Sequence, residues 1–154
     1  MDNLQEIIKQ VVDSVSPNSI NLEQARLLIR RVEEEAKRIG VKAVVAVCNS
    51  GANTIAVESM DDAYIASYDI AVNKAFTSTA LKMPTKELKK LAQPGESLYG
   101  IQFTNNGRIV IFGGGVPFIK NGKVLGALGV SGGTEEQDTH LGDFAVSVFE
   151  EEIL

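Results

Sequence analysis

The chain has 154 residues, of which 44% are hydrophobic and 23% charged, a composition that suits a single domain (residues 1–154) with its own core. Its net charge of −5 and lack of a basic stripe argue against a nucleic-acid partner. No apolar run reaches the roughly 18 residues of a membrane span, and the first residues lack a signal-peptide pattern, so we expect no membrane partner and a cytoplasmic protein.

Two amphipathic helices are predicted first. Apolar residues recur at helical spacing until Ser16–Asn18 interrupts the pattern, so residues 1–18 are expected to form an extra N-terminal helix. Asn21 and Gln24 match a capping box and begin a second helix that ends near Gly40. The apolar face of the first helix comprises Leu4, Ile7, Ile8, Val11 and Val15.

A hairpin and a long helix are predicted next. Val41–Ser59 contains two runs of β-branched residues around "NSGA", which is typical of a β-hairpin. Asp61 or Asp62 is expected to cap a helix from about Ala63 to Lys82. Pro84 ends that helix, and one or two further turns follow to about Leu91.

The C-terminal third is predicted to hold three strands and a helix. The strands are Arg108–Phe112, Val116–Lys120 and Lys123–Val130, and the last two are joined by an Asn-Gly turn. Thr134 with Gln137 forms a second capping box before the final helix. Five strands joined mainly by hairpins predict an α+β fold with a mostly antiparallel five-stranded sheet and flanking helices.

Glycine is concentrated in Phe112–Asp138, which holds eight of the fourteen glycines in the chain. The spacing there matches neither the phosphate-binding loop nor the dinucleotide-binding fingerprint. Two triplets, Gly113–Gly115 and Ser131–Gly133, are not explained by the predicted strands or hairpin. The second precedes a helix N-terminus, where free amides favour an anion. The alternative is that both triplets are tight corners.

Two charged residues are further candidates for a polar site. Lys74 lies on a face of small and apolar residues in the long helix, and Asp138 lies in the first turn of the final helix. They form either a structural ion pair or part of a polar site, and the residues leave both readings open. The candidate ligand-binding residues are Lys74, Gly113, Gly114, Gly115, Ser131, Gly132, Gly133 and Asp138.

Few other residues are candidates for chemistry. His140 is the single histidine and is predicted at the solvent-facing edge of its helix. Cys48 is the single cysteine, ends a predicted buried strand, and is expected in the core. No recognisable catalytic constellation follows from these residue types.

Three motifs resemble one known family: "DIAVNKAFTSTALKMPTKEL", "QPGESLYGIQ" and "IFGGGVPFIKNGKVLGALGVSGGTEEQD". From about Asn21 to Val148 the sequence is similar to the haem-binding GlcG/HbpS-like proteins, which include the C-terminal domain of PduO-type proteins. Two departures are Asn49, where the family often has an acidic residue, and Glu58-Ser59, where a basic residue is common.

The resemblance implies a profilin- or PAS-like fold that assembles into dimers or larger oligomers. It also implies haem binding, with haem degradation or redox sensing in some members, and genes for diol, glycerol or glycolate use beside others. In the PduO type, a corrinoid adenosyltransferase domain precedes the similar region. We expect the present chain to lack that domain, so the corrinoid link rests on family context alone.

Three functions follow as hypotheses. The first is a binding protein for haem or a related tetrapyrrole, accessory to cofactor or diol, glycerol or glycolate metabolism. The second is an enzyme acting on a small carboxylate or phosphate held by Lys74, Asp138 and Ser131–Gly133. The third is a structural or partner-binding module. The candidate axial haem ligands are His140 and Cys48 and, as substitutes, Tyr64, Tyr68, Met60 and Met83.

We also expect a homo-oligomer, at least a dimer. The extra N-terminal helix has an apolar face that a closed core does not need, and the long central helix carries small or apolar residues on both sides. Either helix is a candidate interface, and the alternative is that the N-terminal helix folds back over its own sheet.

Overall fold

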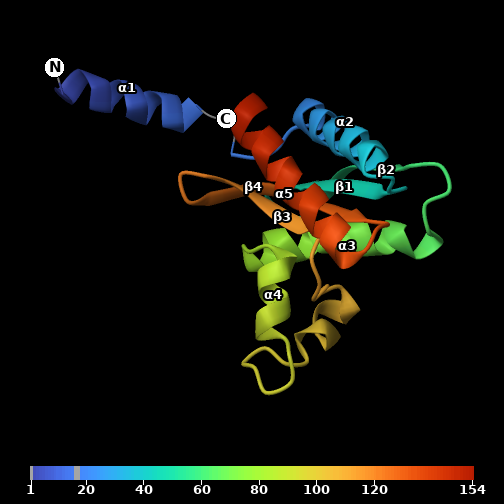
Figure 1. Cartoon of the computed structure of the whole chain (residues 1–154). Helices are drawn as coiled ribbons and strands as arrows, with labels where there is room; N and C mark the ends of the chain where they lie inside the picture. The colour runs from blue at the N-terminus through green and yellow to red at the C-terminus, as the bar shows by residue number, and fades with distance from the viewer. Residues whose placement is uncertain (1, 16–17) are drawn as a thin grey trace.

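The computed structural model describes residues 2–15 and 18–154. Within these residues the strands form one antiparallel sheet, in the spatial order β2-β1-β4-β3 (Figure 1). β1 (Val44–Asn49) pairs with both β2 (Thr54–Ser59) and β4 (Lys123–Ser131), and β3 (Gly115–Lys120) pairs with β4. The α+β class is confirmed, but the sheet has four strands, so the prediction of five is wrong.

The missing strand is the predicted Arg108–Phe112. Its backbone bonds to side chains instead of to a neighbouring strand, because Thr77 Oγ1 both donates to Arg108 O at 3.3 Å and accepts from Val110 N at 3.0 Å. The Arg108 guanidinium lies over the Phe76 ring, 3.7 Å from its centroid. The segment is therefore a coil that packs against the helix containing Phe76 and Thr77. These partners are distant in sequence, so local patterns did not predict them.

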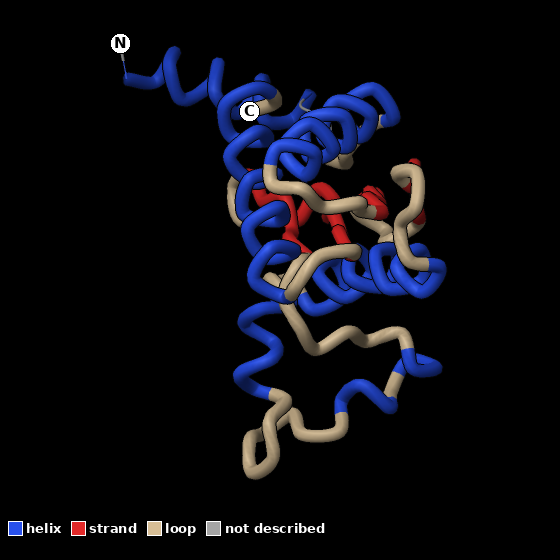
Figure 2. Tube along the Cα trace, turned by 45° about the vertical axis from the view of Figure 1, so that its right-hand side comes forward, coloured by secondary structure: helices blue, strands red, loops and turns tan. Residues whose placement is uncertain are grey.

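Helices cover both faces of the sheet (Figures 1 and 2). α2 (Leu22–Arg38) and α5 (Glu135–Glu152) pack on one face, and α3 (Ile65–Leu81) packs on the other. The short α4 (Thr85–Leu91) follows α3 and leads into two single-turn 3-10 helices, Ile101–Phe103 and Asn105–Gly107. No described helix has both the length and the apolar character needed to cross a membrane.

Both predicted capping boxes are confirmed. Asn21 and Gln24 exchange side-chain-to-backbone hydrogen bonds at the start of α2, and Thr134 and Gln137 do the same at the start of α5. The predicted cap of α3 is wrong, since Tyr64 is the N-cap residue and makes no side-chain capping bond. Asp62 instead has a left-handed backbone (φ 66°) in the preceding turn.

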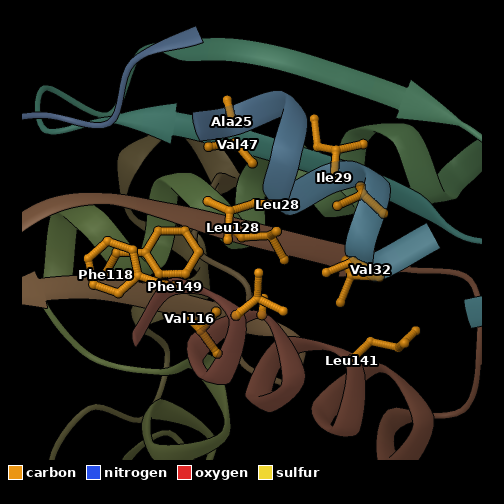
Figure 3. Close-up of a cluster of buried hydrophobic side chains, with 14 of the residues drawn as sticks. Ala25, Leu28, Ile29, Val32, Val47, Val116, Phe118, Leu128, Leu141 and Phe149 are labelled. Atoms are coloured by element: carbon orange, nitrogen blue, oxygen red, sulfur yellow. The ribbon is translucent and has the colours of Figure 1, made fainter. Parts of the chain in front are cut away.

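Large side chains fill the layer between the sheet and α2 and α5 (Figure 3). The Phe118 and Phe149 rings stack with centroids 4.9 Å apart, and Leu28 of α2 and Leu128 of β4 are fully buried beside them. Along β1, alternate residues such as Val45 and Val47 belong to this layer. Burial of these aliphatic and aromatic groups is the main apolar contribution to folding.

The opposite layer is built from small residues. Ala46 of β1 and Ala71 of α3 are buried in contact there, and Cys48 packs with Ala75 and Ala127. α3 lies so close to β4 that a Cβ on Gly129 would collide with the backbone of Ala71 and Ala75. Cys48 is buried in this layer, as predicted.

α1 (Asp2–Val15) projects from the rest of the molecule (Figures 1 and 2). The predicted helix is therefore present, although Ser16 and Pro17 of the predicted break lie outside the described residues. The three buried apolar clusters contain no α1 side chain among the described residues.

Candidate functional site

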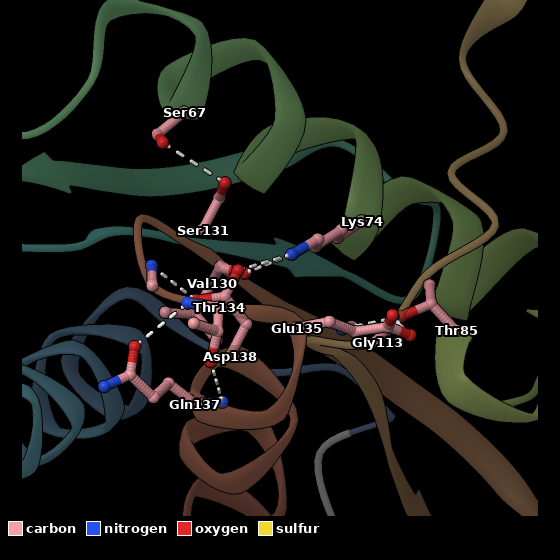
Figure 4. A network of polar contacts seen from close by, with 12 residues as sticks. Ser67, Lys74, Thr85, Gly113, Val130, Ser131, Thr134, Glu135, Gln137 and Asp138 are labelled. Atoms are coloured by element: carbon pink, nitrogen blue, oxygen red, sulfur yellow. Dashed lines mark hydrogen bonds and ion pairs between the residues drawn. The ribbon is translucent and has the colours of Figure 1, made fainter. Parts of the chain in front are cut away.

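A buried ion pair links α3 to α5 (Figure 4). Lys74 is fully buried, and its Nζ donates to Asp138 Oδ2 at 3.1 Å and to Val130 O at 2.8 Å. Asp138 is 4% exposed, and its Oδ1 accepts from Gly133 N at 2.9 Å. The structure thus brings together two residues 64 positions apart that the sequence singled out separately.

Burial and mutual attraction act in opposite directions on this pair. Burial lowers the pKa of Lys74 and raises the pKa of Asp138, while each partner's charge and hydrogen bond oppose that shift. Removal of water from both groups therefore outweighs the attraction between them. Removing only one partner of such a buried pair strongly destabilises the fold, because the other charge stays buried without a partner.

The triple glycine leaves the space that Lys74 occupies. A Cβ on Gly114 (φ 119°) would lie 2.7 Å from Lys74 Nζ and 2.6 Å from Val130 O. Gly115 N donates to Thr85 Oγ1 at 2.8 Å, and Gly113 N donates to Glu135 Oε1 at 3.2 Å. These contacts give the triplet a packing role.

The second triplet joins β4 to α5. Ser131 Oγ is 3.2 Å from Ser67 Oγ in a buried contact. The Gly133 amide is bonded to Asp138, and the Thr134 amide is bonded to Gln137 Oε1 at 2.9 Å. An anion at the Gly133 or Thr134 amide would therefore have to displace an internal acceptor, and the predicted anion site remains a prediction.

Two adjacent pockets open beside this triplet and share Tyr64, Gly132 and Gly133. One, of about 310 Å³, extends towards Lys42 and Gln137, and the other, of about 280 Å³, extends towards α3. We call the two together the glycine groove. The side of the groove towards α3 is completed by Ala66, Ser67, Ile70, Phe112, Ser131, Glu135 and Asp138.

The groove combines accessible aromatic rings with charged side chains. Tyr64, which both pockets share, is 72% exposed, and Phe112, on the side towards α3, is 39% exposed. On the other side, Lys42 Nζ lies 3.4 Å from Asp62 Oδ2 in an exposed pair. Such a surface suits a flat, mostly apolar ligand with an acidic edge.

His140 lies away from the groove. Its Nε2 is 2.6 Å from Glu35 Oε1, and the imidazole is half exposed between α5 and α2. Hydrogen bonds from Arg38, and next from His140, lower the pKa of Glu35 to about 2. The single histidine therefore contacts a carboxylate on the opposite face of the sheet from α3.

The other candidate iron ligands differ in access. The Cys48 Sγ is 3.1 Å from Thr79 Oγ1, and burial raises the pKa of its thiol. Met60 Sδ accepts from Ala43 N at 3.3 Å. Tyr68 is 54% exposed on α3, outside the residues that line the groove. Met83 also lies outside that lining.

Sequence reasoning missed three side chains of this region. Phe112 was placed in a strand, and Glu135 and Thr85 received no role. Thr85 and Glu135 accept from the backbone of the triple glycine across the fold, and no local pattern reveals such a contact for Thr85. The capping box that begins α5 was an available signal for Glu135, since it put this residue in the first helical turn.

Three comparisons place the chain among known proteins. Residues 20–147 match the family described as "Haem degrading protein HbpS-like". A 15.0 kDa Citrobacter freundii protein from the dhaT-dhaS intergenic region is 50% identical over 86% of this chain and 94% of its own length. The corrinoid adenosyltransferase PduO of Salmonella typhimurium is 33% identical over 86% of this chain, which spans only 39% of PduO.

A solved structure gives the same grouping. The crystal structure of a PduOC:haem complex matches with a TM-score of 0.80 and 33% identity, covering 84% of this chain and 94% of the other. Sequence and fold therefore agree from the start of α2 into α5. The chain belongs to the HbpS-like family, as the resemblance of its motifs predicted.

Proposed function

We propose that this protein binds haem or a closely related tetrapyrrole in the glycine groove. The observation that carries the ligand class is the likeness to the PduOC:haem complex. The groove supports the location, because Gly132 and Gly133 line the same pocket as the accessible rings of Tyr64 and Phe112. A role accessory to cofactor or diol, glycerol or glycolate metabolism belongs to the same proposal.

The residues present fit haem with an unusual ligand. Histidine, cysteine, methionine and tyrosine are the side chains that hold haem iron in proteins. Of the described residues that line the groove, only Tyr64 has such a side chain. His140, the candidate from sequence, is bonded to Glu35 elsewhere. We therefore assign the iron to the Tyr64 phenol and the propionates to the Lys42 end.

Hydrogen bonds and ion pairs within the protein fix the backbone that lines the groove. The Lys74–Asp138 pair holds Gly133 through the Asp138 carboxylate and holds β4 through Val130. Lys89 pairs with Glu135, which in turn binds the Gly113 amide beside Phe112. Bound haem would supply an iron for redox or dioxygen chemistry, with a potential tuned by its axial ligand and surroundings.

Titration with hemin, followed at the Soret band, tests the proposal. We expect the intact chain to shift the band at one equivalent, and Tyr64→Phe to weaken binding about tenfold or more, equivalent to about 1.4 kcal/mol. Tyr99→Phe is the matched control, since Tyr99 is 65% exposed and outside the groove. No shift with the intact chain would reject haem, and loss of binding in His140→Ala but not Tyr64→Phe would move the site to His140.

A small carboxylate or phosphate is the second candidate ligand. The observation that favours it is that a carboxylate, that of Asp138, already binds the Gly133 amide beside the Lys74 ammonium. An anion that displaced the Asp138 carboxylate would meet the same amide and the same ammonium. A melting temperature that rises with glycolate or phosphate, but not with hemin, would favour this function.

A further inference from the structure

We propose that α1 is a self-association helix, which packs against the α1 helices of other copies of this chain to form a small helical bundle. Its apolar face, which we call the α1 face, consists of Leu4, Ile7, Ile8, Val11 and Val15. All five side chains are between 49% and 75% exposed. A helix of 14 residues is marginal in water when nothing packs against its apolar side.

The body of the protein does not provide the packing that the α1 face lacks. The described contact between them is polar, with Asn121 Nδ2 donating to Asp13 Oδ1 at 3.3 Å. The family match begins at residue 20, after α1, and the sheet has helices on both faces without α1. The α1 face is therefore an addition to an otherwise closed fold.

The spacing of the α1 face indicates another α1 as its partner. Leu4, Ile8, Val11 and Val15 are separated by four, three and four residues, the alternation of a coiled-coil seam. β-branched residues occur at both kinds of seam position, which favours bundles of more than two helices. Ile7 flanks the seam where a two-stranded coil usually has a charged residue, so the apolar face is wide enough for two neighbours.

Area and charge support the same partner. A helix of 14 residues is about 21 Å long, so a single pair buries far less than the roughly 800 Å² per partner of a stable complex. Several copies are therefore needed. Glu6, Lys9 and Asp13 lie off the seam, so identical copies do not bring like charges together there. With three acidic residues and one lysine, α1 also lacks the basic face of a membrane-surface helix.

Light scattering after size exclusion tests the bundle on full-length chains. We expect the intact chain to have at least three times the monomer mass, and Ile8→Asp/Val11→Asp to have a lower mass. Asn3→Asp/Gln10→Asp adds the same charge on the polar side of α1 and should leave the mass unchanged. An intact chain that is monomeric, or an equal loss of mass in both variants, would overturn the proposal.

A cross-linking experiment tests the contact between α1 helices even if residues outside α1 also form an interface between copies. Ile8 lies at the middle of α1, so copies meet there whether the helices run parallel or antiparallel. Under mild oxidation, Ile8→Cys should form intermolecular disulfides several times faster than Gln10→Cys. Equal rates would show that α1 does not pack on α1. Flotation of the intact chain with phosphatidylcholine vesicles, lost in Ile8→Asp/Val11→Asp, would identify a membrane as the partner instead and also reject the bundle.

Discussion

The two faces of the sheet are built on different principles. The face under α2 and α5 buries large side chains, among them the stacked rings of Phe118 and Phe149. The face under α3 carries small residues such as Ala46 and Gly129, and it buries the ammonium of Lys74. The first face supplies apolar burial, whereas the second allows a helix to approach closely and a charge to reach Asp138.

The groove lies at the end of the second face. Small side chains and bare glycine backbone leave space at the end of the second face, and the Lys74–Asp138 pair fixes the backbone around that space. The first face has no such requirement, because its side chains interdigitate with α2 and α5. Variants on the two faces should therefore differ both in how much unfolding free energy they lose and in whether that loss depends on pH.

The largest effect is expected from Lys74→Met, which leaves Asp138 buried without its cation. We expect a loss of about 3–5 kcal/mol in the free energy of unfolding at neutral pH, measured by urea denaturation. The double variant Lys74→Met/Asp138→Leu should recover most of it, because no unpaired charge remains. A double variant as unstable as the single one would contradict the account of this pair.

The Lys74→Met loss should depend on pH. Burial raises the pKa of Asp138 above its ordinary value, and without Lys74 only the backbone hydrogen bonds from Gly133 and Gly132 oppose that shift. A carboxyl with a raised folded-state pKa contributes stability when protonated, and this contribution is lost as the pH rises through that pKa. Denaturation near pH 4, roughly the ordinary aspartate pKa, should therefore show a smaller loss than at pH 7. A loss independent of pH would mean that Asp138 stays neutral or relocates.

On the opposite face, Leu28→Ala should act through packing alone. Leu28 is fully buried, and its truncation should cost about 3 kcal/mol through lost burial and a residual cavity. Urea denaturation at pH 4 and pH 7 should give the same loss, in contrast to Lys74→Met. A strong pH dependence here would remove the distinction between the two faces.

Gly114→Ala tests the close approach at the triple glycine. A Cβ there would meet Lys74 Nζ and Val130 O, whereas one on Gly107 would have open space. Both glycines have positive φ, 75° at Gly107 and 119° at Gly114, so Gly107→Ala controls for the part of the backbone strain that the two positions share. We expect Gly114→Ala to cost roughly 2 kcal/mol more than its control, in line with overpacking of a tight site. Equal losses would indicate that only φ matters.

The smallest effect is expected from His140→Ala. The pair with Glu35 is half exposed on the histidine side, and exposed pairs contribute roughly 0.2–1 kcal/mol. Thermal denaturation should change by no more than a few degrees, and hemin binding should be retained. A large loss of hemin binding would show that the ligand site is on the α2 and α5 side.

Local patterns predicted much of this molecule. The capping boxes of α2 and α5, the β1–β2 hairpin and the Asn121-Gly122 turn depend on neighbouring residues, and all are present. The predicted cap of α3 and the supposed strand at Arg108–Phe112 were wrong. The N-cap of α3 is Tyr64, which makes no side-chain capping hydrogen bond. The Arg108–Phe112 segment instead forms backbone hydrogen bonds with the Thr77 hydroxyl, which is distant in sequence.

The candidate site was predictable only in part. Lys74 and Asp138 stood out because charged residues on apolar helix faces need partners, but their distance could not be known. The glycine triplets suggested a ligand, whereas the structure gives Gly114 a packing role first. The accessible rings of Tyr64 and Phe112 come together only through the tertiary fold.

A crystal structure of the chain grown with hemin is the most direct test of the central claim. We expect the porphyrin to lie over Gly132 and Gly133, with the iron ligated by the Tyr64 phenol and the propionates towards Lys42. Iron bound by His140 on the α2 and α5 side, or hemin absent from the glycine groove at saturating concentration, would contradict the account.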